Sequence, residues 1–534
     1  MQNSPSSSSR ARVLPMRPGA FLIEFDTLAE VMSASAGLTA DPVAGIEEFV
    51  PGARTLLVRH DAQITNRNEI VEQVLARSAD TDLGQAGEIV EIPVVYDGED
   101  LTDVAQILGC DVDEVIRRHT ETIFSVAFTG FAPGFAYLSG GTTNLHVPRR
   151  SSPRTIVPEG AVGLAGEFTG VYPKASPGGW QLIGRTDLAM FDINREPAAL
   201  LRPGLRVRFR AVQSFETLRE NTAVSAVRKA DAACSIEVIS APLPVLAQDL
   251  GRPGLSQHGI SLSGAADSAS YLSANRIVGN ARSAVALEIP PAPFTFRVNG
   301  KIVAAVTGAA ESIAVLDSDG ARTSLKSWTA LALDDGDVVT IEAPSAGVRS
   351  YLAVRGGFDF TLVLGSASAD TLAQLGPEPV KAGDLVPLNP TKTRLAVQPT
   401  AEPAFAMPRA GDTVALDVYL GPRHDWFTQD AVGQFLSQEW VVGQQSNRVG
   451  MRLTGDALER LVQGELPSEA TLAGAIQVPA NGQPVLFLKD HPVTGGYPVI
   501  ATLRAEQLGL ASQIPAGARI RFNAIGSTNM NGRT

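Results

Sequence analysis

An apolar run that ends in three ionisable residues is the segment of this sequence best equipped for chemistry. Residues 486–503 read LFLKDHPVTGGYPVIATL, so a strand-like stretch leads directly into Lys489, Asp490 and His491. An ammonium, a carboxylate and an imidazole side by side can act as cation, base and acid in proton transfer. We predict these three as catalytic residues. The competing interpretation is a hairpin whose charged side chains face water.

A second segment, residues 147–186, combines cations, glycines and an aromatic ring, as anion-binding sites do. Glycines leave backbone N–H groups bare, and such groups beside a cation suit a carboxylate or a phosphate. A solvated array of turns would use the same letters. The residues predicted here to bind a ligand are Arg149, Lys174, Gly178, Gly179 and Trp180.

Two further glycine-rich turns complete the candidate ligand-binding set. The turn TGGYP supplies Gly495, Gly496 and Tyr497, and the loop DLGRPGLSQHG supplies Arg252. That loop leads into a helix, and the free N–H groups at a helix start attract anions. Asp267, at the beginning of the same helix, is interpreted only as a favourable first-turn charge.

The stretch FTGFAPGFAYLSG, residues 128–140, carries aromatic rings among turn-forming residues. Gly130, Pro133 and Gly134 prevent a stable helix across it, so we predict a strand, a turn at Ala-Pro-Gly and a second strand. Its aromatic rings fit either the filling of a β-barrel or the wall of a ligand pocket.

The usual signatures of nucleotide, metal and carrier sites are missing from the sequence. There is no GxxxxGK[ST], HExxH or GxSxG motif, and no Met-Lys dipeptide of the kind to which biotin is attached. The six histidines show no metal-ligand spacing, and Cys110 and Cys234 form no CxxC motif. We therefore predict no metal site and no disulfide framework.

Charge and hydropathy limit the partners and the compartment. The net charge of −12 argues against nucleic acid or an anionic membrane as the main partner. No apolar run approaches the ~18–20 residues of a transmembrane helix. The opening MQNSPSSSSRARVLPMRPG lacks the apolar core of a secretory signal. These features predict a cytoplasmic protein.

The chain of 534 residues is too long for one ordinary core, so it must divide into several units. Strand-like and helix-like pieces alternate at its start, whereas short apolar runs between glycine and proline turns predict mainly β structure beyond. The expected units are a disordered tail (1–18), a small α+β domain (19–88), a β-barrel (89–212), a linker (213–234) and two strand-rich units (235–390 and 391–534).

A weak internal echo links two of these units. Residues 201–209 read LRPGLRVRF and residues 514–522 read IPAGARIRF. Each places a turn before a strand in which arginine alternates with apolar residues. We interpret them as the final strands of two related barrels.

Several longer motifs resemble one known family. GFAPGFAYL, VPRR, TGVYP and SPGGWQLIGRT resemble the B subunit of bacterial ATP-dependent 5-oxoprolinase, whereas DLGRPG, SNRVGMRLTG, GAIQVPANGQP and DHPVTGGYP resemble its C subunit. The same regions are also labelled allophanate hydrolase subunits 1 and 2, and they resemble the carboxyltransferase part of urea carboxylase. The chain thus looks like a fusion joined near residues 213–233. The resemblance implies tandem cyclophilin-like β-barrels after the α+β domain.

The resemblance implies an ATP-dependent hydrolase of a cyclic amide. Fused B and C subunits would act with a separate protein like the A subunit to open 5-oxo-L-proline to L-glutamate. ATP with Mg would be the co-substrate, without covalent biotin, and the predicted ligand-binding residues would hold substrate or ATP. Phosphorylation of the lactam oxygen would make the ring carbon attackable by water, and Lys489 would stabilise the developing charge. The resemblance is compatible with a homo-oligomer and with a single copy of the chain, and it favours neither.

Two other functions compete with this one. The first is the carboxyltransferase component of a urea carboxylase-type biotin enzyme, although the sequence contains neither a biotin carboxylase nor a biotinyl carrier. The Asp490-His491 pair favours it, because many 5-oxoprolinase C subunits have an Arg-Gln-type pair at His491-Pro492. The second is a non-enzymatic binding protein, since a relative of the B subunit inhibits a sporulation histidine kinase.

Overall fold

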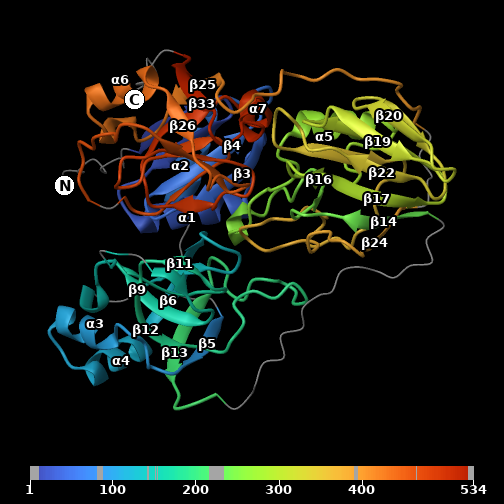
Figure 1. The fold of residues 1–534 in the computed structure, drawn as a ribbon. Helices are drawn as coiled ribbons and strands as arrows, with labels where there is room; N and C mark the ends of the chain where they lie inside the picture. Colours follow the sequence, from blue (N-terminus) through green and yellow to red (C-terminus); the bar gives the residue numbers. More distant parts are fainter. Residues whose placement is uncertain are drawn as a thin grey trace.

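Four folded units follow one another along the chain and make a mainly β protein (Figure 1). The structure is a computed structural model that describes residues 11–80, 88–140, 143–150, 152, 154–215, 234–389, 395–464 and 466–526. Most of the predicted linker and the first ten residues of the predicted tail lie outside this part. No helix among the described residues is both long and apolar enough to cross a membrane.

The N-terminal domain is an antiparallel sheet, ordered β1-β2-β4-β3, with helices on one face and the C-terminal unit on the other. Its elements are β1 (Arg12–Arg17), β2 (Ala20–Glu24), α1 (Leu28–Ala40), β3 (Ile46–Pro51), β4 (Thr55–His60) and α2 (Arg67–Asp80). The predicted tail is wrong from Arg12 onward. Leu14 and Met16 of β1 are buried against Leu472 and Val493, and this contact orders the segment.

The first barrel has the strand order β12-β9-β10-β7-β6-β13-β5. A bridge between Val95 and Arg185 joins its two edges, which closes the predicted β-barrel. Its elements are β5 (Ile89–Val94), α3 (Leu101–Leu108), α4 (Val112–Glu121), β6 (Ile123–Thr129), β7 (Ala136–Ser139), a 3-10 turn (Thr143–Leu145), β8 (Arg154–Val157), β9 (Ala161–Ala165), β10 (Phe168–Val171), β11 (Ser176–Gly178), β12 (Gln181–Arg185) and β13 (Arg206–Ala211).

The last barrel is closed and has the order β25-β32-β29-β30-β27-β26-β33. In Figure 1 it lies beside the N-terminal domain, on the opposite side of that domain's sheet from α1 and α2. Its elements are β25 (Thr413–Leu420), a 3-10 turn (His424–Trp426), α6 (Gln429–Ser437), β26 (Trp440–Val442), β27 (Gly450–Thr454), β28 (Glu469–Ala470), β29 (Ala475–Gln477), β30 (Val485–Phe487), β31 (Thr494–Gly495), β32 (Val499–Leu503), a 3-10 turn (Ala505–Gln507), α7 (Leu508–Ser512) and β33 (Arg519–Ala524).

The two barrels repeat one topology. Strand for strand, β5, β6, β7, β9, β10, β12 and β13 correspond to β25, β26, β27, β29, β30, β32 and β33. Both final strands pair in parallel with the first strand of their own barrel. A two-stranded sheet, β8 with β11 or β28 with β31, accompanies each barrel. The interpretation of the internal echo as two final barrel strands is therefore confirmed.

The unit between the barrels is built from two sheets rather than from the single barrel expected for 235–390. One apolar core is shared by the strands of both sheets, and α5 (Ser268–Ile277) packs against β18 and β23 of the smaller one. The larger sheet contains β14 (Ser235–Ser240), β17 (Phe294–Asn299), β19 (Ser312–Leu316), β20 (Arg322–Lys326), β22 (Val338–Ile341) and β24 (Leu385–Pro387). The smaller sheet contains β15 (Leu246–Gln248), β16 (Ala286–Ile289), β18 (Ile302–Gly308), β21 (Ala330–Leu333) and β23 (Ser350–Val354).

His119 ties α4 to the inside of the first barrel. Its Nδ1 lies 2.7 Å from the Tyr96 hydroxyl and its Nε2 lies 2.9 Å from Thr169 Oγ1, while the ring stacks on Phe209. Burial lowers the pKa of His119 to about 3. The imidazole is therefore neutral in the folded protein at neutral pH.

This depressed pKa predicts a loss of stability in acid. An unfolded histidine titrates near 6.5, so between about pH 6.5 and 3 the unfolded state binds a proton that the folded state does not. Each pH unit in that window should lower the unfolding free energy by about 1.4 kcal/mol. In thermal unfolding experiments, we expect the variant His119→Gln to be less stable than wild type at pH 7.5. Between pH 7.5 and 5.5, however, the variant should lose less stability than wild type. Equal losses in both proteins would contradict this account.

Candidate functional site

Asp490 lies at a junction where the first barrel, the two-sheet unit and the last barrel meet. Its carboxylate is fully buried and pairs twice with Arg448, at 2.9 Å from both Nε and Nη2. Ser263 Oγ donates to it at 2.7 Å, and Thr371 donates through its amide at 2.9 Å and its hydroxyl at 2.8 Å. Burial opposes ionisation, but the Arg448 guanidinium and these hydrogen bonds hold the pKa of Asp490 below its usual value.

The pairing continues into the two-sheet unit. Arg448 Nη1 lies 2.6 Å from Glu288, whose other oxygen accepts from the Ala266 amide at 2.9 Å and from the Tyr351 hydroxyl at 2.8 Å. The first amides before α5 are thus satisfied within the protein. Asp267 is the N-cap of α5 and accepts from Ser270 N, as a helix-stabilising charge should. The predicted anion site at this helix start is therefore filled by the protein's own groups.

Arg252 also turns inward. Its guanidinium donates to the carbonyl oxygens of Val363, Ser366 and Ser368 at 3.0, 3.3 and 2.6 Å. It is 2% exposed, so its contacts give it a structural role in holding this loop. The structure does not bring it together with the predicted catalytic residues as a ligand-facing cation.

Lys489 differs from its neighbour Asp490 in having no hydrogen-bonding or ionic partner among the residues that the structure describes. The side chain is partly buried, and its ammonium makes no hydrogen bond or ion pair with the described part of the chain. Burial, together with the nearby cations Arg448 and Arg17, lowers the pKa of Lys489 to about 8. Its charge therefore changes close to physiological pH, as a group that handles protons requires.

His491 lines a small cavity. Its Nδ1 lies 2.9 Å from the Pro492 carbonyl oxygen, which can only accept, so Nδ1 carries the hydrogen. Nε2 then holds a lone pair, and no described residue hydrogen-bonds to it. Burial lowers the pKa of His491 to about 4, so the ring is neutral. The cavity is lined by Phe131, Pro133, Gly259, Ser261, Asp370, Leu372, Ala373, His491, Pro492 and Val493.

The TGGYP turn docks on the aromatic loop of the first barrel. The amide of Phe131 donates to Thr494 Oγ1 at 2.9 Å, and a Cβ added to Gly130 would lie 2.3 Å from that oxygen. Phe131 has a φ of 62°, a conformation that this contact helps to hold. The loop runs from β6 to β7 through a turn, which confirms the predicted strand–turn–strand.

The Gly-Gly-Trp segment mainly packs the first barrel. Trp180 is 5% exposed and meets Phe135 edge-on at 5.3 Å between ring centroids. A Cβ on Gly178 would lie 2.3 Å from the Tyr172 hydroxyl, and Gly179 O accepts from Arg150 N at 2.8 Å. Gly178 therefore leaves no room for a Cβ, and Gly179 takes part in backbone pairing.

Arg149 and Lys174 both reach out of the first barrel. Arg149 Nη2 lies 3.4 Å from Ser468 Oγ, and its Nη1 lies 3.2 Å from the position of a Cβ on Gly496. Lys174 Nζ lies 3.4 Å from the Ala373 carbonyl oxygen, and burial lowers its pKa. Lys174 follows β10 as Lys489 follows β30, so the two lysines occupy corresponding places in the repeated barrels.

The structure thus brings some predicted residues together and separates others. Lys489, Asp490 and His491 share the junction with Gly495 and Gly496, with Arg149 and Lys174 reaching it from the first barrel. The side chains of Arg252 and Trp180 are buried in packing contacts elsewhere, whereas the side chain of Tyr497 is 43% exposed.

Sequence reasoning missed Asp370, Ser261 and Arg448. Asp370 stands in a small-residue run, GSASADT, and no motif there marks it as functional. Arg448 stands in SNRVGMRLTG, a motif that carries the family resemblance but assigns this residue no role. Only the folded chain brings Asp370 and Ser261 to the cavity that His491 lines.

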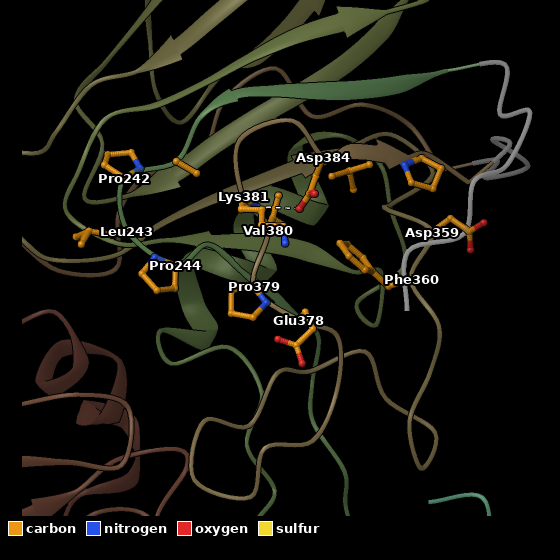
Figure 2. A pocket seen from close by; sticks show the side chains of 13 residues that line it. Pro242, Leu243, Pro244, Asp359, Phe360, Glu378, Pro379, Val380, Lys381 and Asp384 are labelled. Atoms are coloured by element: carbon orange, nitrogen blue, oxygen red, sulfur yellow. Dashed lines mark hydrogen bonds between the residues drawn. The ribbon is translucent and has the colours of Figure 1, made fainter. Parts of the chain in front are cut away.

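A wide groove lies away from all of these residues. Figure 2 shows it on the two-sheet unit, with Leu243, Phe360 and Pro379 around it and Lys381 hydrogen-bonded to Asp384. Its volume is ≈ 600 Å³. None of the predicted site residues lines it, so the groove is no part of the junction site.

Comparison with known protein families gives two matches. The model described as "Carboxyltransferase domain, subdomain C and D" matches residues 11–201, and "Carboxyltransferase domain, subdomain A and B" matches residues 258–524. The two matches divide the chain between the first barrel and the two-sheet unit.

Individual relatives divide in the same way. The chain is 36% identical over 291 residues to the 5-oxoprolinase C subunit of Escherichia coli K12, covering 54% of this chain and 90% of that protein. It is 44% identical over 169 residues to the 5-oxoprolinase B subunit of Haemophilus influenzae, covering 31% and 78%. Urea amidolyase of Lachancea kluyveri is 31% identical over 315 residues, covering 55% and 17%.

One solved structure matches the whole arrangement. The crystal structure of TTHA0988 superposes with a TM-score of 0.82 at 31% sequence identity, over 94% of this chain and 99% of that one. Both halves of the present chain therefore have their counterpart in a single folded protein.

The buried Arg448–Asp490 pair predicts a large effect of Asp490→Asn on stability. Removal of the Asp490 charge leaves the buried Arg448 guanidinium with Glu288 as its remaining ion-pair partner among the described residues, and we expect the unfolding free energy to fall by about 3 kcal/mol in urea titrations. Asp97→Asn, which removes an exposed ion pair to Arg185, should change it by less than about 1 kcal/mol.

A double replacement separates charge loss from packing loss. Arg448→Met combined with Asp490→Leu removes both charges and leaves Glu288 paired with Arg349, 3.5 Å away, so it should recover part of the stability that Asp490→Asn loses. If Asp490→Asn costs no more than Asp97→Asn, the pair does not hold the junction.

Proposed function

Because the chain belongs to the carboxyltransferase-domain family, we propose that it is a fused B and C component of an ATP-dependent 5-oxoprolinase. With a separate protein like the A subunit, it would open 5-oxo-L-proline to L-glutamate. The observation that carries this proposal is the meeting of the B-like and C-like parts in one chain, where Phe131 bonds Thr494 and lines a cavity with His491. Relatives named as B and C subunits of 5-oxoprolinase support it.

The chemistry asks for a cation and a proton acceptor, and the junction offers both. An amide carbon is a poor electrophile, and transfer of a phosphoryl group from ATP to the amide oxygen would activate it. The Lys489 ammonium, which has no partner among the described residues, would stabilise negative charge on that oxygen or on the phosphoryl group. His491 Nε2 is unprotonated at neutral pH and can accept a hydrogen bond from substrate or water.

ATP with Mg enters this proposal as co-substrate. Phosphate oxygens require cations and bare backbone amides. The residues that would supply them are Lys489, Arg149 and Lys174, with Gly495 and Gly496 as the amide-bearing turn. Lys174 Nζ makes long hydrogen bonds, 3.4 and 3.5 Å from the carbonyl oxygens of Ala373 and Gln374.

A carboxyltransferase acting on a urea-type substrate is the second candidate. Two observations favour it: the similarity to urea amidolyase and the Asp490-His491 pair within KDHPVTGGYP. In that reaction a carboxyl group would pass from carboxybiotin, carried by another protein, to a urea nitrogen. The same neutral His491 and cationic Lys489 would face this substrate.

One mixture decides between the candidates. The purified chain, ATP, 5-oxoproline and a candidate A subunit should together yield L-glutamate and ADP. Absence of glutamate, with carboxylation of urea from a supplied carboxybiotin donor, would replace the first proposal by the second. Failure of both, with tight binding to a histidine kinase, would favour a binding protein.

Lys489 supplies a prediction with a pH signature. If its ammonium stabilises charge, glutamate formation should fall as pH rises through about 8, where the lysine loses its proton. Lys489→Ala should lower kcat/KM by about 100-fold or more. Lys489→Arg, which stays charged, should retain part of the activity at pH 9. Lys301→Ala, at an exposed surface ion pair, is the matched control and should behave as wild type. Full activity of Lys489→Ala would remove this residue from the site.

A further inference from the structure

Asp370, which lies far from the Lys-Asp-His run in sequence, faces the same cavity as His491. The carboxylate comes from the two-sheet unit, the imidazole from the last barrel, and Phe131 and Pro133 of the first barrel complete the wall. The space in this cavity that the centre of a water-sized sphere can reach is ≈ 10 Å³, at the lower limit of what holds one water molecule. A site of this size suits a water with polar partners on two sides.

The Asp370 carboxylate is held firmly but is not neutralised by a direct ion pair among the described residues. Oδ1 accepts from the amides of Leu372 and Ala373 at 3.0 and 2.8 Å, and Oδ2 accepts from Ser261 Oγ at 2.8 Å. Burial and the neighbouring Asp490 carboxylate raise the pKa of Asp370 to about 6. The other charged groups that act on it are Arg448, Arg252 and Lys174.

The His491 ring and the Asp370 carboxylate can each accept one hydrogen bond from the same water molecule. His491 Nε2 holds a lone pair, because Nδ1–H donates to Pro492 O, and its weak basicity suits orientation rather than proton removal. Asp490, Glu48 and Arg17 are the charged groups that act on this ring. A water that donates one hydrogen to Nε2 and the other to Asp370 would keep a lone pair free to attack.

We propose that Asp370 is the general base of the junction site and acts on a water molecule held between its carboxylate and His491 Nε2. The identity of the electrophile rests on the proposed function; the water site itself does not. A base whose pKa lies near the working pH combines the correct protonation state with useful proton affinity.

The step balances as follows for an amide activated by a phosphoryl group from ATP. The water oxygen bonds to the acyl carbon and Asp370 takes a proton from it. The carbon–nitrogen bond then breaks. The ring nitrogen receives the protons that the added water loses, and Asp370 passes them on. An acyl phosphate remains, and a second water converts it to carboxylate and inorganic phosphate.

Asp370→Asn tests this role because asparagine fills the same space but cannot take a proton. In the presence of ATP and the A subunit, its rate of glutamate formation should fall by about 100-fold or more. Wild-type activity should rise with pH through about 6, where Asp370 ionises, and the variant should lack this rise. Asp337→Asn, a buried carboxylate of the same unit bonded to the Asp334 amide, is the matched control and should keep both rate and pH profile.

Rescue distinguishes a base from a structural residue. Formate added to Asp370→Gly should restore part of the rate, because a small carboxylate can occupy the vacated space. A variant Asp370→Asn that keeps the wild-type rate or the rise near pH 6, or an absence of formate rescue, would overturn the proposal.

A failure of the proposed function can be told apart from a failure of this inference. If wild type makes no glutamate, the function is wrong, and the water site is then judged by a high-resolution crystal structure of the chain. That structure should show a water within hydrogen-bond distance of Asp370 and His491 Nε2. Its absence there would overturn the inference whatever the reaction.

Discussion

Arg448 and Asp490 form a buried ion pair at the junction, and the positions of the other site residues follow from it. Two charges removed from water are tolerated only with close geometry and satisfied hydrogen bonds, so the last barrel and the two-sheet unit can meet in few ways. Ser263, Thr371 and Glu288 complete that geometry from the two-sheet side. Lys489 and His491 flank Asp490 in the chain and are therefore carried to the same place.

The same burial shifts the pKa values of the neighbouring groups in different directions. It lowers the pKa of Lys489 to about 8 and of His491 to about 4, because both are charged when protonated. It raises the pKa of Asp370 to about 6, where the ionised Asp490 adds to the effect. A neutral imidazole, a titrating amine and a titrating carboxyl therefore stand near one permanently ionised pair, an arrangement suited to proton transfer.

The repeated barrels explain why both parts of the chain contribute. Each barrel places a lysine after corresponding strands, Lys174 after β10 in the first and Lys489 after β30 in the last. The copies have diverged in what surrounds them. Lys174 donates hydrogen bonds to carbonyl oxygens of the two-sheet unit, whereas Lys489 has no partner in the described part of the chain. One site at the junction thus draws on two copies of one architecture.

Local pattern by itself determined many of the strands and turns, the strand–turn–strand at 128–140 and the two closing strands, because each depends on neighbours in sequence. The tertiary structure decided which of those residues are free to react. Asp490 is committed to Arg448, Arg252 to the carbonyls of Val363, Ser366 and Ser368, and Trp180 to an aromatic cluster. Asp370 and His491 come to line one cavity only after the 120 residues between them have folded, and no spacing rule reports burial or partners across such distances. Composition also could not reveal that β1 is ordered, since its order comes from contact with the last barrel.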